Sequence, residues 1–374
     1  MSDKLLTVIV PSYNLEEYLP KCLGSLIVPN EALLRQLDVI VVNDGSKDRT
    51  SEIAHDFERR YPGVFRVIDK ANGNYGSCIN AGLPEAKGYY VRILDADDSA
   101  NTLEFQSLLF AMSKEGSKGE DSADLIISDY VVVDPTGATL ERVGYSFLKP
   151  DVPQLLSDVP KLSSRFMLHA VTYKTDILRR LDYRQTEGIS YTDTEWTLEP
   201  MVGVSRILRV PAAATRYLVG RAGQTCEPST YVRQFGEFVQ IAAGLASRYD
   251  LRLSQCTPVS QAYYQEKLLG LLFYIFEGGI YGLRRNDSIC RHRISVDLKA
   301  LDLAIRKSSS LVALTENARY PSTHCPLRLI WAWRRHPGRG TLGIVLFWCF
   351  IRIRYIAQKI CRLVYNFNHA IRGQ

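Results

Sequence analysis

Three carboxylates are packed into four positions at Asp95, Asp97 and Asp98, directly after the apolar run Tyr89–Leu94. The run has the length and composition of a buried β-strand, so the acids are expected at the carboxyl end of that strand. Open α/β sheets bind their ligands at this edge. Carboxylates this close repel one another unless a divalent cation or ligand hydroxyls compensate their charge. The spacing therefore indicates a ligand or metal site, with a solvated acidic turn as the alternative.

Two earlier apolar runs, Leu5–Val10 and Val39–Val42, also end in polar residues. The first run is followed by Pro11–Asn14 and the second by Asn43–Ser46. Because the carboxyl ends of parallel strands meet at one edge of a sheet, the three polar loops are expected to converge. For the second loop, capping of the next helix by Ser46 is the structural alternative.

Apolar runs alternate with helix-like segments through the first half of the chain, and helical periodicity dominates from about Thr230. Strands are predicted at Leu5–Val10, Val39–Val42, Phe65–Ile68, Tyr89–Leu94 and Leu125–Val133, and helices at Glu16–Leu26, Arg49–Arg60, Tyr75–Glu85, Leu103–Ser113, Tyr231–Arg248, Ser260–Tyr281 and Ser295–Arg306. The βαβα order predicts an α/β fold with a mostly parallel sheet and helices on both faces. We therefore expect two domains, an α/β domain at 1–225 and a mainly α-helical region at 226–374.

The composition is that of an ordinary globular protein, with 374 residues, 46% hydrophobic and 23% charged. None of the eight cysteines forms a Cys-x-x-Cys pair, which argues against a zinc site and favours free thiols in a reducing cytoplasm. The first apolar run is ended early by Pro11 and is too short for a signal peptide. A cytoplasmic protein is expected.

Four short motifs, in this order, resemble family 2 glycosyltransferases with the Rossmann-like GT-A fold, of the non-processive bacterial type. They are Val10–Asn14, Val42–Ser46, Asn72–Ser77 and Leu94–Asp98, and the resemblance covers residues 5–225. It implies transfer of a sugar from a nucleotide-diphosphate donor. The Gln-x-x-Arg-Trp motif typical of processive polysaccharide synthases does not occur in the chain, so the resemblance implies addition of a single sugar.

The resemblance also implies how the donor nucleotide is held. Pro11, Tyr13 and Asp44 would cradle the base, with Asn72 beside it. The Asp44 carboxylate would accept a hydrogen bond from a uracil N–H, which makes a UDP-sugar the expected donor.

The Asp-x-Asp motif of the family falls on Asp95 and Asp97. Asp95 would meet the ribose hydroxyls or the metal, and Asp97 would coordinate Mg²⁺ or Mn²⁺ at the diphosphate, a role that suits hard oxygen ligands. The family often carries an Arg near the nucleotide where this chain has Ile79. Lys70 or Arg221 could supply the missing charge, with a solvated loop residue as the alternative for Lys70.

The segment Tyr191–Trp196 resembles the Glu-Asp-x-x-Trp motif of the family, with Thr192 in place of the Glu. The match implies that Asp193 is the base that takes the acceptor proton in an inverting transfer. Trp196 lies three residues further on the same helical face and is predicted to bind the acceptor sugar. An ordinary helix start for Asp193 and a core position for Trp196 are the alternatives. Glu195 points elsewhere, so it ranks below Asp193 as a base.

The last part of the chain is basic. Residues 321–374 contain nine Lys and Arg and no acidic residue, while the whole chain has a net charge of +6. The apolar run Thr341–Ile351 is too short to span a bilayer. As a helix, this region would present one apolar stripe flanked by Arg352 and Lys359, formed by Ile344, Phe347, Trp348, Ile351 and Tyr355. It predicts peripheral binding to the inner face of the cell membrane, with packing on protein as the alternative. Nucleic acid is not an expected partner, because no known binding fold accompanies the charge.

Gly220–Thr225 resembles the loop that closes the family's catalytic domain, and a plain linker is the alternative. The function expected from the whole sequence is an inverting hexosyl- or N-acetylhexosaminyltransferase acting on a glycan or lipid-linked acceptor, as in cell-surface polysaccharide biosynthesis. A sugar nucleotidyltransferase is one alternative, but Pro11–Asn14 lacks the Gly- and Arg/Lys-rich phosphate loop of such enzymes. A non-catalytic nucleotide-sugar or glycan-binding module is the other.

Overall fold

The computed structural model describes residues 4–159, 162, 166–221, 230–285, 288–319, 328–335 and 353. The chain forms two compact units, Met1–Leu268 and Leu269–Gln374. The described residues of the first unit build a ten-stranded sheet from β1 (Leu6–Ser12), β2 (Leu37–Asn43), β3 (Phe65–Asp69), β4 (Tyr90–Ile93), β5 (Ser99–Ala100), β6 (Leu125–Val133), β7 (Thr139–Val143), β8 (Gln154–Leu155), β9 (Val171–Lys174) and β10 (Arg206–Leu218). Its helices are α1 (Leu19–Ser25), α2 (Glu31–Arg35), α3 (Thr50–Arg60), α4 (Asn74–Gly82), α5 (Thr102–Gly116), α6 (Thr175–Arg180), α7 (Asp193–Leu198), α8 (Thr230–Ser247) and α9 (Tyr249–Ser254). Helix α10 (Pro258–Arg285) continues into the second unit, which also contains α11 (Ser288–Ile305), α12 (Ser309–Asn317) and α13 (Leu329–Arg335).

The predicted α/β fold is confirmed, and the sheet is mixed. Its strand order is β3-β2-β1-β4-β9-β6-β10-β5, with β7 paired to β6 and β8 paired to β10. Strands β3, β2, β1 and β4 are parallel as predicted, but β9 lies antiparallel between β4 and β6. The half of the sheet beyond β4 thus contains short and antiparallel strands that the apolar pattern did not predict.

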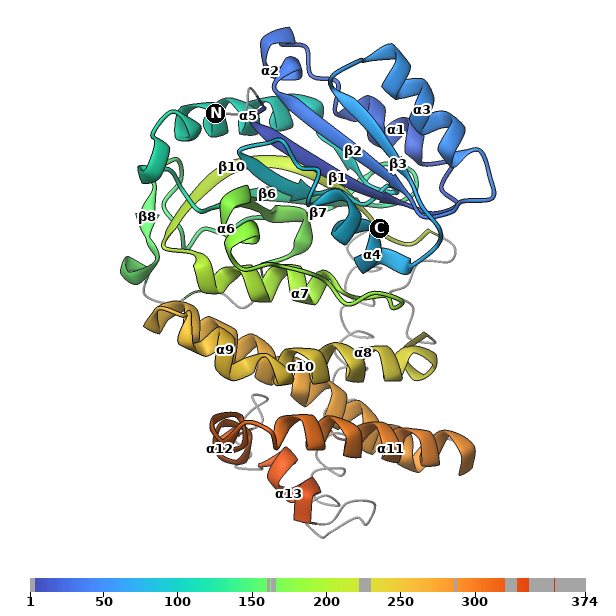
Figure 1. The fold of residues 1–374 in the computed structure, drawn as a ribbon, viewed down its shortest axis with the longest axis vertical. Helices are drawn as coiled ribbons and strands as arrows, with labels where there is room; N and C mark the ends of the chain where they lie inside the picture. The colour runs from blue at the N-terminus through green and yellow to red at the C-terminus, as the bar shows by residue number, and fades with distance from the viewer. Residues whose placement is uncertain are drawn as a thin grey trace, which may run out of the picture. The chain divides into compact units, whose positions relative to one another are not determined.

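Side chains of the central strands alternate between two helical layers. Val8 and Val10 belong to one core cluster with residues of α1, α3 and α5. Ile9 faces the other way and packs against Gly82 of α4. Because successive strand residues point to opposite faces, a strand covered on both sides is apolar throughout. Figure 1 shows α1, α2 and α3 on one side of this half of the sheet and α4 on the other.

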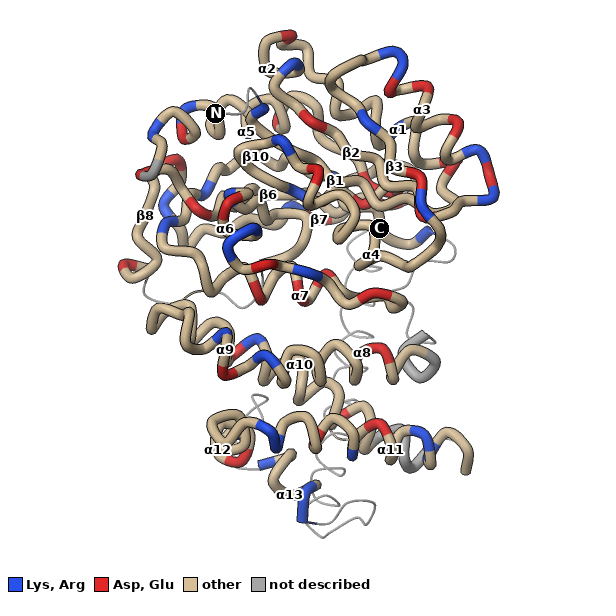
Figure 2. The backbone as a smooth tube through the Cα atoms, viewed as in Figure 1, with Lys and Arg blue, Asp and Glu red and all other residues tan. Residues whose placement is uncertain are grey.

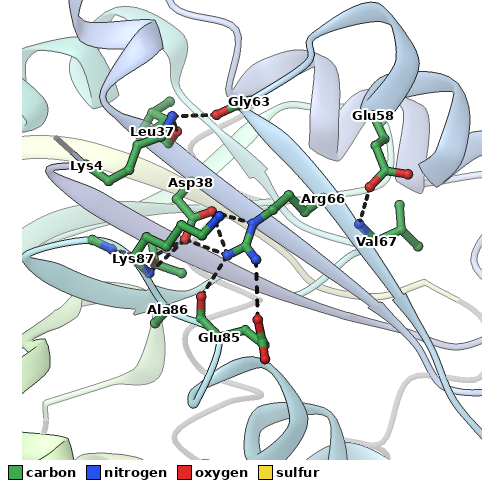
Figure 3. A network of polar contacts seen from close by, with 12 residues as sticks. Lys4, Leu37, Asp38, Glu58, Gly63, Arg66, Val67, Glu85, Ala86 and Lys87 are labelled. Carbon is green, nitrogen blue, oxygen red and sulfur yellow. Dashed lines mark hydrogen bonds and ion pairs between the residues drawn. The ribbon is translucent and has the colours of Figure 1, made fainter. Parts of the chain in front are cut away.

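A polar network joins the amino-terminal ends of β1, β2 and β3, at the edge of the sheet remote from the acidic loop (Figure 3). At its centre, Asp38 is 1% exposed and accepts hydrogen bonds from Arg66 Nε at 2.8 Å and Thr7 Oγ1 at 2.7 Å. Lys4 Nζ donates to the carbonyls of Arg35 and Leu37 at 2.7 Å each. Since Asp38 is paired within the protein, we interpret this network as structural.

Helices α8 and α9 belong to the first compact unit, although the sequence placed the domain boundary after residue 225. Arg248, between these helices, donates from Nε to Glu199 Oε1 at 2.8 Å. The hydroxyl of Tyr263 in α10 donates to the carbonyl of Thr197 at 2.9 Å. These contacts join the helical segment to α7 and the residues that follow it, and the compact unit accordingly extends to Leu268.

The second unit is helical, as predicted for this region. Nε of Arg334 lies 2.6 Å from Asp302 Oδ1, and the Arg334 side chain is only 4% exposed. Arg334 therefore joins α13 to α11, although the sequence counted it with the basic tail. Among the described residues, no helix is both long enough and apolar enough to cross a bilayer. All residues of the predicted stripe, Ile344, Phe347, Trp348, Ile351 and Tyr355, lie outside the described part of the chain.

Candidate active site

A pocket of about 480 Å³ opens at the carboxyl ends of β1, β2 and β4. Its walls also include the start of α4, the residues just before β9 and the start of α7. The lining residues are Pro11, Ser12, Tyr13, Leu15, Asp44, Asn72, Asn74, Tyr75, Cys78, Asp95, Ala96, Asp97, Met167, Leu168, His169, Ser190, Tyr191, Thr192, Asp193, Tyr217 and Arg221. The structure thus brings the predicted nucleotide, metal and base residues together around one pocket.

The loop after β1 presents an aromatic side chain to the pocket. Tyr13 follows the last residue of β1 and is 45% exposed. Asn14 adopts a positive φ of 52°, and its Oδ1 accepts a hydrogen bond from the Lys47 N–H at 2.8 Å. An exposed aromatic ring beside a fixed turn offers a flat face on which a planar base can stack.

Asp44, directly after β2, is 2% exposed and organises the loop before α4. Its two carboxylate oxygens accept hydrogen bonds from the N–H groups of Gly73 and Asn74 at 2.9 and 2.8 Å. Nδ2 of Asn72 donates to the Asp44 carbonyl at 3.0 Å. Asp44 and Asn72 are therefore held as neighbours on the pocket wall, where their predicted roles require them.

The two candidates for the phosphate charge lie in different surroundings. Lys70 does not line the pocket, and its Nζ donates to Asp44 Oδ1 at 2.6 Å and to Ser77 Oγ at 2.9 Å. Arg221 lines the pocket, and its Nε lies 2.6 Å from Asp97 Oδ2. Lys70 thus supports the loop, while Arg221 is the cation placed at the acidic motif.

The other two acids of the motif converge on a histidine that sequence reasoning had not identified. Asp95 Oδ1 accepts a hydrogen bond from the Tyr75 hydroxyl at 2.6 Å, and Asp98 Oδ1 accepts one from the Leu218 N–H at 2.7 Å. Asp98 Oδ2 is buried without a hydrogen bond and lies 3.4 Å from His169 Nδ1. Ligand atoms of Asp95, Asp98 and His169 lie within 4.8 Å of one another.

This arrangement favours an added positive charge. Burial, reinforced by the charges of Asp98 and Asp97, raises the pKa of Asp95 to about 7. Burial also raises the pKa of Asp98 well above its usual value and lowers that of His169. Carboxylates that resist ionisation for lack of a counter-charge, together with an orphaned buried oxygen, fit a hard divalent cation at this loop.

The candidate base, Asp193, is the first residue of α7 and lines the pocket. Burial raises its pKa, and the charges of Lys267 and His169 oppose that rise. Lys267 comes from α10, where its Nζ donates to the Phe166 carbonyl at 3.1 Å. A carboxylate with a raised pKa that faces a pocket suits the acceptance of a proton from a hydroxyl.

Buried polar contacts hold α7 in place from several sides. Glu195 is fully buried and accepts hydrogen bonds from the Thr186 N–H at 2.7 Å and from Arg248 at 3.1 Å. The Tyr173 hydroxyl donates to the carbonyl of Trp196 at 3.1 Å. Glu195 is therefore a structural acid, in agreement with its lower rank as a base.

The structure does not place Trp196 against an acceptor. Its side chain is fully buried, does not line the pocket, and packs edge-on against Tyr173 and Tyr183 with ring centroids 5.2 and 5.7 Å away. The sequence periodicity placed Trp196 on the same helical face as Asp193. In α7, however, most side chains are buried, including those of Trp196 and its neighbours Glu195, Thr197 and Leu198. The prediction that Trp196 binds the acceptor is therefore wrong, and its side chain belongs to the core.

An aromatic residue on the other side of the base does reach the pocket. Tyr191 has a positive φ of 64°, which is a strained conformation for a bulky residue. Its ring stacks on Phe238 of α8 at 4.5 Å, and its hydroxyl donates to Gln234 of the same helix. Ser190 N–H donates to Glu237 Oε2 at 2.8 Å. One face of α8 thus fixes the segment that leads into the base.

Sequence reasoning missed three tyrosines that line the pocket, Tyr75, Tyr191 and Tyr217. It also missed Met167, Leu168 and His169, which line the pocket just before β9. Tyr75 and Tyr191 stand inside quoted motifs, so their position was a signal that could have been used. His169 had no such signal, because it reaches the acidic loop only through the antiparallel pairing of β9. Of the predicted closing loop, Gly220 and Arg221 are described, and residues 222–225 lie outside the described part.

Comparison with known proteins found similarity to glycosyltransferases. Residues 7–122 match the family model "Glycosyl transferase family 2". EpsJ of Bacillus subtilis, an uncharacterized glycosyltransferase, is 39% identical over 104 residues, which cover 28% of this chain and 29% of EpsJ. YibD of Escherichia coli, also an uncharacterized glycosyltransferase, is 29% identical over 211 residues, 55% of this chain and 58% of YibD. The chain thus spans only part of the length of these relatives.

Solved structures support the fold over a longer range. A crystal structure of S. aureus TarS 1–349 in complex with UDP-GlcNAc has a TM-score of 0.64 at 18% identity, covering 89% of this chain and 88% of TarS 1–349. The complex of TarS 1–349 with UDP has a TM-score of 0.62. At this identity the likeness establishes the GT-A fold followed by helices, and no more.

Proposed function

We propose that this family 2 glycosyltransferase is an inverting, non-processive enzyme that moves one sugar from a nucleotide-diphosphate donor to a hydroxyl group. The acceptor would be a glycan or a lipid-linked sugar, as in cell-surface polysaccharide biosynthesis, and the sugar a hexose or an N-acetylhexosamine. The observation that carries the proposal is the convergence of Asp44, Asp95, Asp97 and Asp193 on a single pocket. The family match favours glycosyl transfer over the alternatives of a nucleotidyltransferase and a non-catalytic module.

A UDP-sugar is the proposed donor. The Asp44 carboxylate offers about four lone-pair sites, and Lys70, Gly73 and Asn74 occupy three of them. The carboxylate would accept a hydrogen bond from a uracil N–H at the pocket face, with Tyr13 stacked on the base and Pro11 and Asn72 beside it. TarS, which shares the fold, was crystallised with UDP-GlcNAc and with UDP, which supports the choice of uridine.

We propose Asp95 and Asp97 as the residues that would hold Mg²⁺ or Mn²⁺, with the buried acid Asp98 behind them. When bound, the cation would stabilise the negative charge of the departing nucleoside diphosphate. Asp97 must first release Arg221, whose side chain is 20% exposed and lines the same pocket. Arg221 would then be placed to take up a diphosphate oxygen, in the role of the arginine that Ile79 replaces.

The remaining chemistry belongs to Asp193. The acceptor hydroxyl oxygen attacks the anomeric carbon from the face opposite the leaving group. The hydroxyl proton passes to an Asp193 carboxylate oxygen while the bond from the anomeric carbon to the diphosphate oxygen breaks. Inversion follows from this single displacement. Burial raises the pKa of Asp193, which favours acceptance of the hydroxyl proton, and the nearby Lys267 charge opposes that rise.

A screen of nucleotide sugars for release of the nucleoside diphosphate in the presence of Mn²⁺ tests this function. A UDP-sugar should be hydrolysed slowly with water as acceptor, and the Asp97→Ala variant should lose this activity. Release from no donor, or full activity in Asp97→Ala, would contradict the proposal. Pyrophosphate release from a nucleoside triphosphate and a sugar phosphate would instead identify a nucleotidyltransferase.

We propose that the enzyme works in the cytoplasm at the inner face of the cell membrane. The basic composition of residues 321–374 supports this location. The test is the distribution of the full chain between the soluble and membrane fractions of cells at low and high salt. Recovery in the soluble fraction under both conditions would contradict it.

A further inference from the structure

Helix α11 in the second unit carries a line of exposed apolar side chains. Ile289, Val296 and Leu303 are 80%, 50% and 65% exposed. They recur every seven residues, so they follow one another along one side of the helix with a drift of only ~20° per step. Their opposite face is the buried one, formed by Ile294, Leu298, Leu301 and Ile305. The apolar line is therefore additional to the residues that α11 needs for packing.

Basic side chains flank this line on both sides. Arg293 and Lys299 are exposed, and helical geometry places them on either side of Val296. His292, also exposed, lies on the same side as Lys299. Figure 2 shows both acidic and basic residues along α11. Asp302 is 7% exposed and is paired with Arg334, and Asp297 is half-buried.

The charges argue against a second copy of the helix as the occupant of this face. In a coiled coil built on Ile289, Val296 and Leu303, the companion core positions three residues later would be His292 and Lys299. Two such helices would bring like charges together in the seam. An anionic bilayer has the opposite requirement, because apolar side chains enter the acyl boundary while basic ones meet the phosphate groups.

We propose that the outward face of α11 docks on the surface of an anionic membrane. Ile289, Val296 and Leu303 enter the headgroup region, and Arg293 and Lys299 pair with lipid phosphates. This contact is separate from the active-site pocket and independent of the basic tail. It gives the chain a membrane-binding element within its folded part. On docking, the axis of α11 lies parallel to the bilayer surface.

The test is flotation of the full chain with vesicles of phosphatidylcholine alone or with about 30 mol% phosphatidylglycerol. The wild type should float only with anionic vesicles. Replacing Ile289, Val296 and Leu303 together by Ser should reduce binding by about tenfold or more, since the inserted area is lost. A matched control replaces Leu103, Leu140 and Leu251 by Ser, because these are 66%, 60% and 58% exposed in the first unit.

A second variant keeps the apolar line and tests the charges. The double change Arg293→Gln and Lys299→Gln should weaken binding and its salt dependence, whereas Arg59→Gln and Arg60→Gln on α3 should leave both unchanged. Far-UV circular dichroism and melting curves verify that the variants are folded. Wild-type chain that does not float, or α11 variants that bind as well as their controls, would overturn the proposal. The proposal would also be overturned if the α11 variants lost dimers in light scattering while their vesicle binding stayed unchanged. The apolar face would then be an interface with a second copy of the chain.

Discussion

Removal of Arg221 should strengthen the binding of Mn²⁺ to the donor-free protein. The Arg221 guanidinium lies 2.6 Å from Asp97 Oδ2, and the two side chains are 20% and 14% exposed. A cation that takes Asp97 as a ligand must break this contact and also meets the positive charge of Arg221. A hydrogen bond between charged groups contributes about 1.5–3 kcal/mol. Because ~1.4 kcal/mol corresponds to a factor of ten, Arg221→Met should raise the Mn²⁺ affinity by about ten- to a hundredfold.

The measurement is a titration of free Mn²⁺ by electron paramagnetic resonance, without nucleotide and at constant ionic strength. Arg35→Met is the control, since it removes the same charge from an exposed pair with Glu31 on α2. The same Arg221 variant should bind UDP more weakly in the presence of Mn²⁺, because it lacks the cation proposed for the diphosphate. An unchanged or weaker Mn²⁺ affinity in Arg221→Met would refute the assignment of Asp97 as a metal ligand.

Three further outcomes are expected. Asp193→Asn should reduce transfer by roughly 10²–10⁴-fold with an unchanged donor Kd by calorimetry, and a parallel loss of donor binding would indicate a structural role instead. Lys267→Met should raise the pKa of Asp193, so the acid limb of the pH–rate profile, where activity is lost as the base becomes protonated, should move to higher pH; an unmoved limb would contradict the role of Lys267. Gly76→Ala would bring a Cβ within 2.1 Å of the Thr186 carbonyl oxygen and should cost about 1–3 kcal/mol in the free energy of unfolding together with activity. Gly24→Ala, which has open space around it, should leave both nearly unchanged, and equal effects in thermal melts of the two variants would disprove this account.

The sequence predicted the donor side of the pocket well for a physical reason. Strands β1, β2 and β4 are covered on both faces, so each reads as a mainly apolar run whose end is marked by polar residues. The polar ends at Pro11–Asn14, Asp44 and Asp95–Asp98 then had to lie at one edge of the sheet, because the strands are parallel. The structure places all three loops on the pocket.

The acceptor side was harder to predict, because it depends on pairing between distant segments. Strand β10 pairs with β6 about eighty residues earlier, and its sequence contains Pro211 and charged residues that break the apolar pattern. Helical periodicity placed Trp196 beside Asp193, but it could not show that this face packs on Tyr173 of β9. The partners of buried charges, such as Lys70 with Asp44, were likewise beyond the reach of local patterns.

The support of α7 by later helices has a consequence for the order of events during synthesis. The loops that line the donor side of the pocket are complete once β10 has been made. The residues that hold α7 come later in the chain: Arg248 donates to Glu195, and the Tyr263 hydroxyl donates to the Thr197 carbonyl. At about 5–20 residues per second, the intervening stretch takes several seconds to translate. We therefore expect that the nascent chain can bind a nucleotide sugar before the proposed catalytic base, Asp193, is fixed in place. Such a delay separates the acquisition of donor binding from the onset of catalysis.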